Sequence, residues 1–204
     1  IYSKDGVKAV KRTKDITGNH GAYISKDRDS EGLMLQAKIS TNIQIPSLSK
    51  MASSCWFVSP RKLKKLADDA KKRFEIKCVS VDAPVNSMSG GNKQKVNLSR
   101  WLIQDLDFII LDCPTRGVDI GVKAYIYNLL EKEAKERKRA ILLISDELPE
   151  VMGMSDRVLI MKDGKVAGVL AVDKDGKDIE ITCKAAIVCT GGAGCNKKFI
   201  EDET

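Results

Sequence analysis

Two short apolar runs separated by one amphipathic helix constrain the fold of this chain most. Phe108–Leu111 and Ala140–Ile144 are continuous apolar segments, typical of strands buried on both faces. Between them apolar residues recur at helical spacing over residues 120–135, and basic residues crowd the end of that segment as the helix dipole favours. A short helical segment, Leu148–Met152, then precedes a third strand-like run, Arg157–Met161. The alternation predicts an α/β fold with a parallel sheet.

Three further segments upstream show clear patterns. Ala22–Ser25 is a short β-like run. Ser59 followed by Pro60 is typical of a helix N-terminus, and the apolar spacing after it predicts an amphipathic helix over residues 60–74. Ser89 is the expected N-cap of another helix, which should fade near Asp105.

The pattern changes after the expected turn at Asp163 and Gly164. Val166–Val172 and Asp178–Cys183 flank a polar Lys-Asp-Gly-Lys turn and predict a β-hairpin. Ala185–Cys189 is expected as a last buried strand, before a glycine-rich end. We therefore expect a main domain followed by a small appendage.

Composition excludes several classes of function. The net charge of +7 is dispersed among acids and apolar residues, and aromatic residues make up 5% of the chain, so we expect solvated helix faces and no nucleic-acid surface. The six cysteines form no Cys-x-x-Cys pair and His20 is the single histidine, which argues against a zinc site or a histidine-based triad. Scattered thiols fit a reducing cytoplasm. No apolar run reaches the ~18–20 residues of a membrane span.

Two polar sites follow from the order of these elements. Ser89-Gly90-Gly91 opens a helix where backbone N–H groups are free, and two glycines allow a phosphate to approach closely, although the same residues also form an ordinary N-cap. Asp112 ends a buried strand and can hold Mg²⁺ through its water shell, or can cap the next turn. Asp119 is likewise a candidate cap for the helix at residues 120–135.

These motifs together resemble the ATP-binding subunit of ABC transporters, in particular the second nucleotide-binding half of the ribose, galactose or xylose importers. The resemblance covers roughly residues 15–168. Its matching segments are the Q-loop region Gly21–Leu33, the signature Ser87–Val96, the Walker B strand Ile109–Asp112, the D-loop region Pro114–Ala124, and the switch region with its closing strand, Ile144–Val158.

The resemblance implies a partial P-loop-NTPase-like sheet with a helical subdomain over residues 1–168. It implies ATP and Mg²⁺ as cofactors, with Asp112 on the metal. It also implies a second nucleotide-binding half and a membrane permease subunit as partners, and a cytoplasmic position at the inner face of the cell membrane. The nucleotide contacts that it implies are Ser89, Gly90, Gly91, Asn92, Lys26 and Asp119.

Departures from the family pattern point to a degenerate or truncated half-site. No GxxxxGK[ST] loop, the Walker A motif, precedes residue 21. Cys113 stands at the position of the catalytic Glu, Asp146 at that of the switch His, and Lys26 at that of the Q-loop Gln or Glu. A thiol with a pKa near ~8.5 is a poor general base. We therefore expect no ATP hydrolysis by the chain alone.

The tail, residues 169–204, has a resemblance of its own. Asp173–Asn196 is similar to part of the flavoprotein subunit of fumarate reductases and succinate dehydrogenases, which indicates a chimeric chain. Because the tail has no GxGxxG loop, we expect no FAD binding by it alone. Gly191–Lys198 resembles a Walker A loop without its last Gly and its Ser/Thr, and we expect no working loop there. The alternatives are a fragment of an FAD-dependent oxidoreductase and a non-catalytic interaction module.

Overall fold

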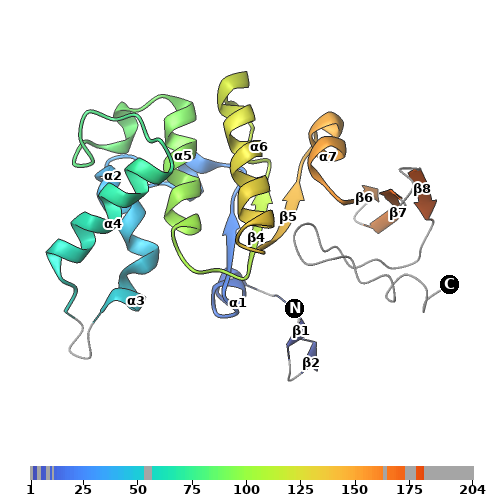
Figure 1. Ribbon diagram of the computed structural model, residues 1–204, viewed down its shortest axis with the longest axis horizontal. Coiled ribbons are helices and arrows are strands. Elements are labelled where there is room, and N and C mark those ends of the chain that lie inside the picture. Colours follow the sequence, from blue (N-terminus) through green and yellow to red (C-terminus); the bar gives the residue numbers. More distant parts are fainter. Residues whose placement is uncertain are drawn as a thin grey trace.

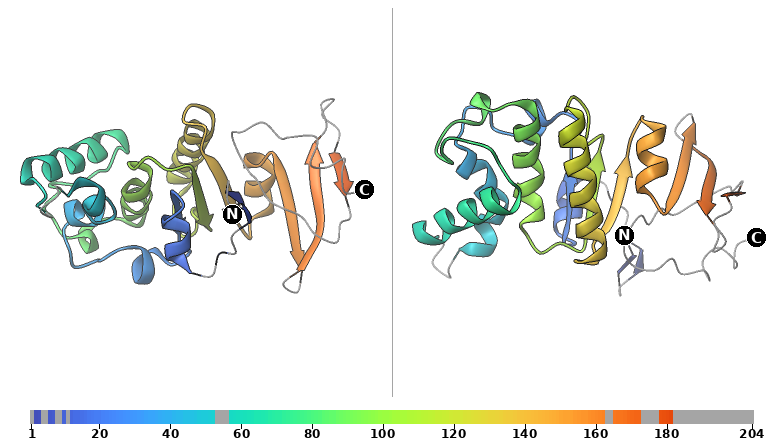
Figure 2. Two further views of the ribbon diagram at one scale, coloured as in Figure 1. Left: turned by 90° about the horizontal axis from the view of Figure 1, so that it is seen from below. Right: turned by 45° about the horizontal axis from the view of Figure 1, so that its top comes forward.

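The computed structural model describes residues 2–3, 6–7, 10, 12–52, 57–162, 165–172 and 178–181. Three groups of elements lie side by side in it: a helical group, a central sheet with its helices, and a second sheet (Figures 1 and 2). Four features predicted from the sequence lie outside the described residues. They are the turn at Asp163–Gly164, the turn at residues 174–177, the strand at residues 185–189 and the glycine-rich end.

The central sheet is parallel, as predicted. Its three strands, β3 (Gly21–Ile24), β4 (Phe108–Asp112) and β5 (Ala140–Ile144), lie in the order β3-β4-β5. β4 is the middle strand, with Ile109 and Leu111 fully buried. The prediction that β5 is buried along its length is wrong, because it is an edge strand and Ile144 is 45% exposed. The carboxyl end of β4, at Asp112, thus lies between the carboxyl ends of β3 and β5.

The strand after β5 does not extend this sheet, which corrects the sequence prediction. β6 (Arg157–Lys162) pairs antiparallel with β7 (Lys165–Val172), and β7 pairs antiparallel with β8 (Asp178–Ile181). Only two residues separate β6 from β7, so a hairpin partner is available locally. The pairing of β7 with β8 confirms the predicted hairpin as far as Ile181. β7 runs across residue 168, and the division into two domains stays a prediction.

The three long helices form where the sequence predicts them. They are α4 (Pro60–Arg73), α5 (Gly90–Leu102) and α6 (Ile120–Lys135), with the short α7 (Leu148–Met154) after β5. α5 packs on β3 and α6 on β5. The N-terminal ends of α5, α6 and α7 lie at the same edge as the carboxyl ends of the strands (Figure 1).

The remaining elements are short. They are β1 (Tyr2–Ser3), β2 (Gly6–Val7), α1 (Thr13–Thr17), α2 (Ile39–Gln44), α3 (Leu48–Met51), a π-helical turn at Arg28–Gly32, and 3₁₀ turns at Ile45–Ser47 and Val85–Ser87. α2 packs against α4 and α5. The mixed sequence around α2 gave no helix prediction. Among the described residues, no helix has the length and apolar character that crossing a bilayer requires.

A single apolar core joins the helical group to the central sheet. Ile39 and Ile43 of α2, Phe74 after α4, and Leu98 of α5 are all fully buried in it, together with Ile109 of β4. The core therefore fixes α5, whose N-terminus carries the candidate signature, against the sheet that carries Asp112.

A buried ion pair ties the same groups together. Arg139 Nη1 donates to Glu133 Oε2 of α6 at 2.6 Å. The same guanidinium also donates to the carbonyl oxygens of Leu102, the last residue of α5, and of Gln104 after it. Arg73 at the end of α4 pairs with the same glutamate. The buried Glu133 and Arg139 thus each have an opposite charge beside them, which offsets the cost of their burial.

Candidate functional site

Asp112 is held at the carboxyl end of β4 by a hydrogen bond from the neighbouring strand. The Tyr23 hydroxyl on β3 donates to Asp112 Oδ2 at 3.1 Å. Burial and the bond to Asp112 raise the pKa of Tyr23, so the phenol stays a donor. Asp112 Oδ1 accepts none of the hydrogen bonds found in the described residues, which leaves one oriented oxygen for a metal ion or its waters.

Cys113 follows Asp112 in a backbone conformation that disfavours most side chains. Its φ is 46°, and its N–H donates to the carbonyl oxygen of Ile144 at 2.8 Å. The thiol is 6% exposed and donates weakly to Asp146 Oδ1 at 3.9 Å. Burial and then the Asp146 charge raise the pKa of Cys113, so the group stays a neutral thiol and cannot act as a base near neutral pH.

Lys26 and Asp146 meet above this strand end. Lys26 Nζ lies 3.5 Å from Asp146 Oδ2. The backbone N–H of Asp146 and then the Lys26 ammonium lower the pKa of the Asp146 carboxyl, which is therefore charged at neutral pH. Both side chains are exposed, so the pair contributes little to stability. The structure thus brings together Lys26, Cys113 and Asp146 beside Asp112; their proposed roles stay predictions.

The N-terminus of α5 keeps free donors. Ser89 is the N-cap residue, but its side chain makes no cap hydrogen bond, and its hydroxyl instead accepts from the Asn92 amide at 3.0 Å. The N–H groups of the first turn are thus available to an anion such as a phosphate. These residues and Asp112 fit a nucleotide with Mg²⁺. Among the described residues no cluster of three metal-ligating side chains occurs, so the ion would need the phosphates as further ligands.

The two glycines of the signature have different surroundings. A Cβ on Gly91 would lie 2.6 Å from Val122 of α6, so Gly91 allows the close approach of α5 and α6. A Cβ on Gly90 would lie 3.0 Å from the Arg28 guanidinium. Arg28, which the sequence analysis did not single out, donates to the Arg116 carbonyl oxygen at 3.2 Å. It therefore joins the signature end of α5 to the turn after β4.

Asp119 is a helix cap in this structure. Its side chain accepts from the N–H of Val122 at 2.9 Å and begins α6, as one of the two readings of the sequence predicted. Gly117 precedes it with a φ of 66°, a conformation that glycine adopts without strain. A nucleotide contact from Asp119 stays a prediction.

Sequence reasoning missed a buried set of polar side chains that links the turns around the site. Gln94, Thr115 and Glu150 are buried, and hydrogen bonds join them through the turn after β4. Polar residues on amphipathic helices are normally assigned to the solvent face, so periodicity gave no signal for them.

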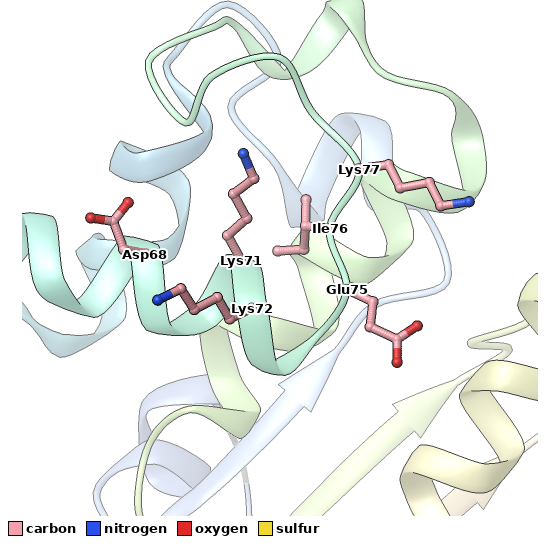
Figure 3. Close-up of a pocket in the computed structure, with 6 residues that line it drawn as sticks. All are labelled: Asp68, Lys71, Lys72, Glu75, Ile76 and Lys77. Carbon is pink, nitrogen blue, oxygen red and sulfur yellow. The ribbon is translucent and has the colours of Figure 1, made fainter.

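A pocket of about 550 Å³ lies at the end of α4, and the backbone N–H of Lys77 in its lining donates to Asn92 Oδ1 of α5 at 2.9 Å. Its lining is Asp68, Lys71, Lys72, Glu75, Ile76 and Lys77. The three lysine side chains point in different directions, and two carboxylates lie among them (Figure 3). The charges do not converge on one point, so the pocket does not form an anion site.

Comparison with known proteins agrees with this geometry. A profile of the family described as ABC transporter matches residues 4–116, more than half of the chain. The ribose import ATP-binding protein of Clostridium tetani is 37% identical over 171 residues, covering 84% of this chain and 34% of that protein. The xylose import ATP-binding protein of Geobacillus kaustophilus is 41% identical over 172 residues, covering 84% and 32%. The chain thus spans about a third of the length of these relatives.

Solved structures share the fold. A dimeric ATP-binding cassette in a post-hydrolysis state with ADP and Pi matches with a TM-score of 0.66 at 22% identity, covering 76% of this chain and 64% of that one. A nucleotide-free ATP-binding cassette from an ABC transporter matches with a TM-score of 0.64 at 17% identity, covering 81% and 66%. The chain belongs to the ABC transporter family and has the fold of its ATP-binding domain.

Proposed function

We propose that this chain acts as a nucleotide-binding half of an ABC sugar importer and that its own hydrolytic site is impaired. The sugar-import names of its relatives support the transported class. Asp112 would hold Mg²⁺, and Ser89, Gly90 and Gly91 would cap the γ-phosphate of a nucleotide bound by a second nucleotide-binding half. ATP with Mg²⁺ would supply the free energy for transport.

One observation carries the proposal of an impaired site: Cys113 and Asp146 contact each other beside Asp112. A neutral thiol supplies no general base where water must be activated. The charged Asp146 carboxylate would repel a γ-phosphate, and Lys26 is already paired with it. Loss of general-base help typically costs about 10²–10⁴ in rate. We therefore expect hydrolysis to depend on the partner's base and phosphate loop.

The proposed assembly follows from this dependence. The chain would sit on the inner face of the cell membrane through a permease subunit, in the cytoplasm, opposite an intact nucleotide-binding half. We propose residues 1–168 as the partial ABC domain and residues 169–204 as the appendage with flavoprotein resemblance.

The test is Mg²⁺-ATPase activity of the chain mixed with an intact nucleotide-binding half. The mixture should turn over faster than the intact half alone, because the chain supplies Ser89–Gly91 to the nucleotide that the half binds. Ser89→Ala should lower this gain. Ser87→Ala is the matched control, because the Ser87 hydroxyl is bonded to the Pro84 carbonyl outside α5. A mixture no faster than the intact half would contradict the proposal and favour a non-catalytic interaction module.

A further inference from the structure

The turn after β4 is held from two sides by buried hydrogen bonds. On one side, Gln94 Nε2 of α5 donates to the Pro114 carbonyl oxygen at 2.6 Å. On the other, the Thr115 hydroxyl donates to Glu150 Oε1 of α7 at 2.7 Å. Because Pro114 and Thr115 share one peptide group, α5 and α7 both restrain the same turn.

The turn after β5 is built on the same carboxylate. The Ser145 hydroxyl donates to Glu150 Oε2, and Ser145 Oγ in turn accepts from the N–H of Glu147 at 3.0 Å. These bonds orient the segment that presents Asp146 to Cys113 and Lys26. Glu150 itself is 5% exposed, so water does not readily replace either hydroxyl donor.

We infer that Glu150 is a positioning residue that ties the turn after β4 to the turn after β5, while Gln94 ties the first of these turns to α5. Hydrogen bonds through Pro114, Thr115 and Glu150 thereby fix the position of α5 relative to the segment that carries Asp146. The inference rests on the proposed function only in treating these turns as parts of a nucleotide site; the hydrogen bonds are independent of it.

The physical basis is the cost of leaving buried donors without partners. The Glu150 carboxylate accepts from hydroxyl groups of two different turns, and the Tyr127 side chain of α6 interacts with it as well. Hydrogen bonds to a charged acceptor are the stronger kind. Removal of the carboxylate would leave both hydroxyls unsatisfied at once. The two turns would then lose their common anchor while the apolar core, made by other residues, stays intact.

The test is hydrogen exchange followed by mass spectrometry without nucleotide, on the wild type, Glu150→Ala and Glu150→Gln. In Glu150→Ala, amides in both turns, residues 113–116 and 144–147, should exchange at least about tenfold faster, the factor that matches loss of one hydrogen bond to a charged group. Those of α4 should not change. Glu150→Gln keeps the shape and one of the two acceptor oxygens, so its exchange in the two turns should lie between that of the wild type and that of Glu150→Ala. Glu131→Ala is the matched control, since Glu131 is exposed and, within the described part of the chain, its ion pair is with Lys135 on the same helix.

Two single-hydroxyl variants keep the inference testable if Glu150→Ala unfolds the chain. Thr115→Val should speed exchange at residues 144–147, and Ser145→Ala should speed exchange at residues 113–116, because each loosens Glu150 for the other turn. If each variant affects its own turn alone, or if Glu150→Gln exchanges as fast as Glu150→Ala, the inference is overturned. Because no nucleotide is present, failure here is distinct from failure of the proposed function, which the ATPase mixture reports.

Discussion

Cys113 determines which chemistry is available at the carboxyl end of β4. It follows Asp112, its side chain is buried, and its thiol donates weakly to a second carboxylate, that of Asp146. Its positive φ is tolerated although an ordinary side chain in that region costs about 1–2 kcal/mol. A residue under such strain is held by its surroundings, here by the N–H bond to Ile144.

The first prediction at this scale concerns the thiol. Because burial and Asp146 raise the pKa of Cys113, alkylation by iodoacetamide should be slow at pH 7 and should rise with a midpoint above the ~8.5 of an ordinary thiol. Folding then favours the protonated thiol, so its contribution to stability is complete below the unfolded pKa and is lost as pH rises through the folded one. Peptide mapping of the labelled protein measures the midpoint. A midpoint below ~8.5 would contradict this prediction and show that the Lys26 charge lowers the pKa of the thiol by more than burial and Asp146 raise it.

The second prediction tests our proposal that Cys113 leaves the site without a general base. Cys113→Glu should raise hydrolysis by the chain mixed with an intact nucleotide-binding half, by up to about 10²–10⁴ if the base limits the rate. Cys113→Gln, with the same shape and no charge, is the control and should not. Equal rates for the two variants would mean that phosphate binding, and not the base, limits turnover. The assay is steady-state phosphate release.

Among the elements, the long helices could be predicted from the sequence, because apolar residues recur in them at helical spacing. The helices α4, α5 and α6 begin within a residue of the predicted positions, because Pro60, Ser89 and Asp119 mark their starts. Periodicity does not record which strands pair, so β6 was assigned to the wrong sheet.

The candidate site was predictable in its residues and only partly in its contacts. The motif positions placed Lys26, Cys113 and Asp146 in one site, and the structure brings them together. Arg28 and Glu150 were not found, because a buried polar contact between distant segments leaves no periodic trace in the sequence. The glycines of the signature were interpreted as phosphate contacts or as part of an ordinary N-cap, and the packing of Gly91 on Val122 needed three-dimensional information.

That packing gives the third prediction. Gly91→Ala places a methyl group against Val122 and should destabilise the chain by about 1–3 kcal/mol, the usual cost of overpacking. Gly90→Ala is the matched control, since only the flexible Arg28 side chain must move. Urea unfolding measures both. Val122→Ala should restore stability in the Gly91→Ala background, and an equal loss in the two glycine variants would contradict the packing role.

The fourth prediction concerns the buried ion pair that joins α4, α5 and α6. Arg139→Ala leaves Glu133 buried and should lower the free energy of unfolding by about 3–5 kcal/mol. The loss should lie at the lower end, because Arg73 still pairs with Glu133. Lys135→Ala breaks only an exposed pair on α6 and should have no measurable effect. Similar unfolding midpoints for the two variants would show that Arg139 does not hold these helices together.

In the molecule as a whole, the described residues form one apolar core, and two groups of polar residues lie at one edge of the central sheet. One group is the free N-terminus of α5; the other is Asp112 with Cys113, Lys26 and Asp146. The family match and the shared fold show an ABC ATP-binding domain, and the roles of these two groups in it are our proposal. We propose that the N-terminus of α5 serves a nucleotide bound by a partner, and that the group around Asp112 does not hydrolyse one.

The most direct measurement of this claim is a calorimetric titration of the chain alone with Mg²⁺-ATP, with phosphate release followed in the same samples. The 204 residues contain no GxxxxGK[ST] loop, so we predict a Kd of about 1 mM or weaker and no phosphate release above background. Tight binding to the monomer, with a Kd near about 1 μM, together with saturable hydrolysis, would contradict the account.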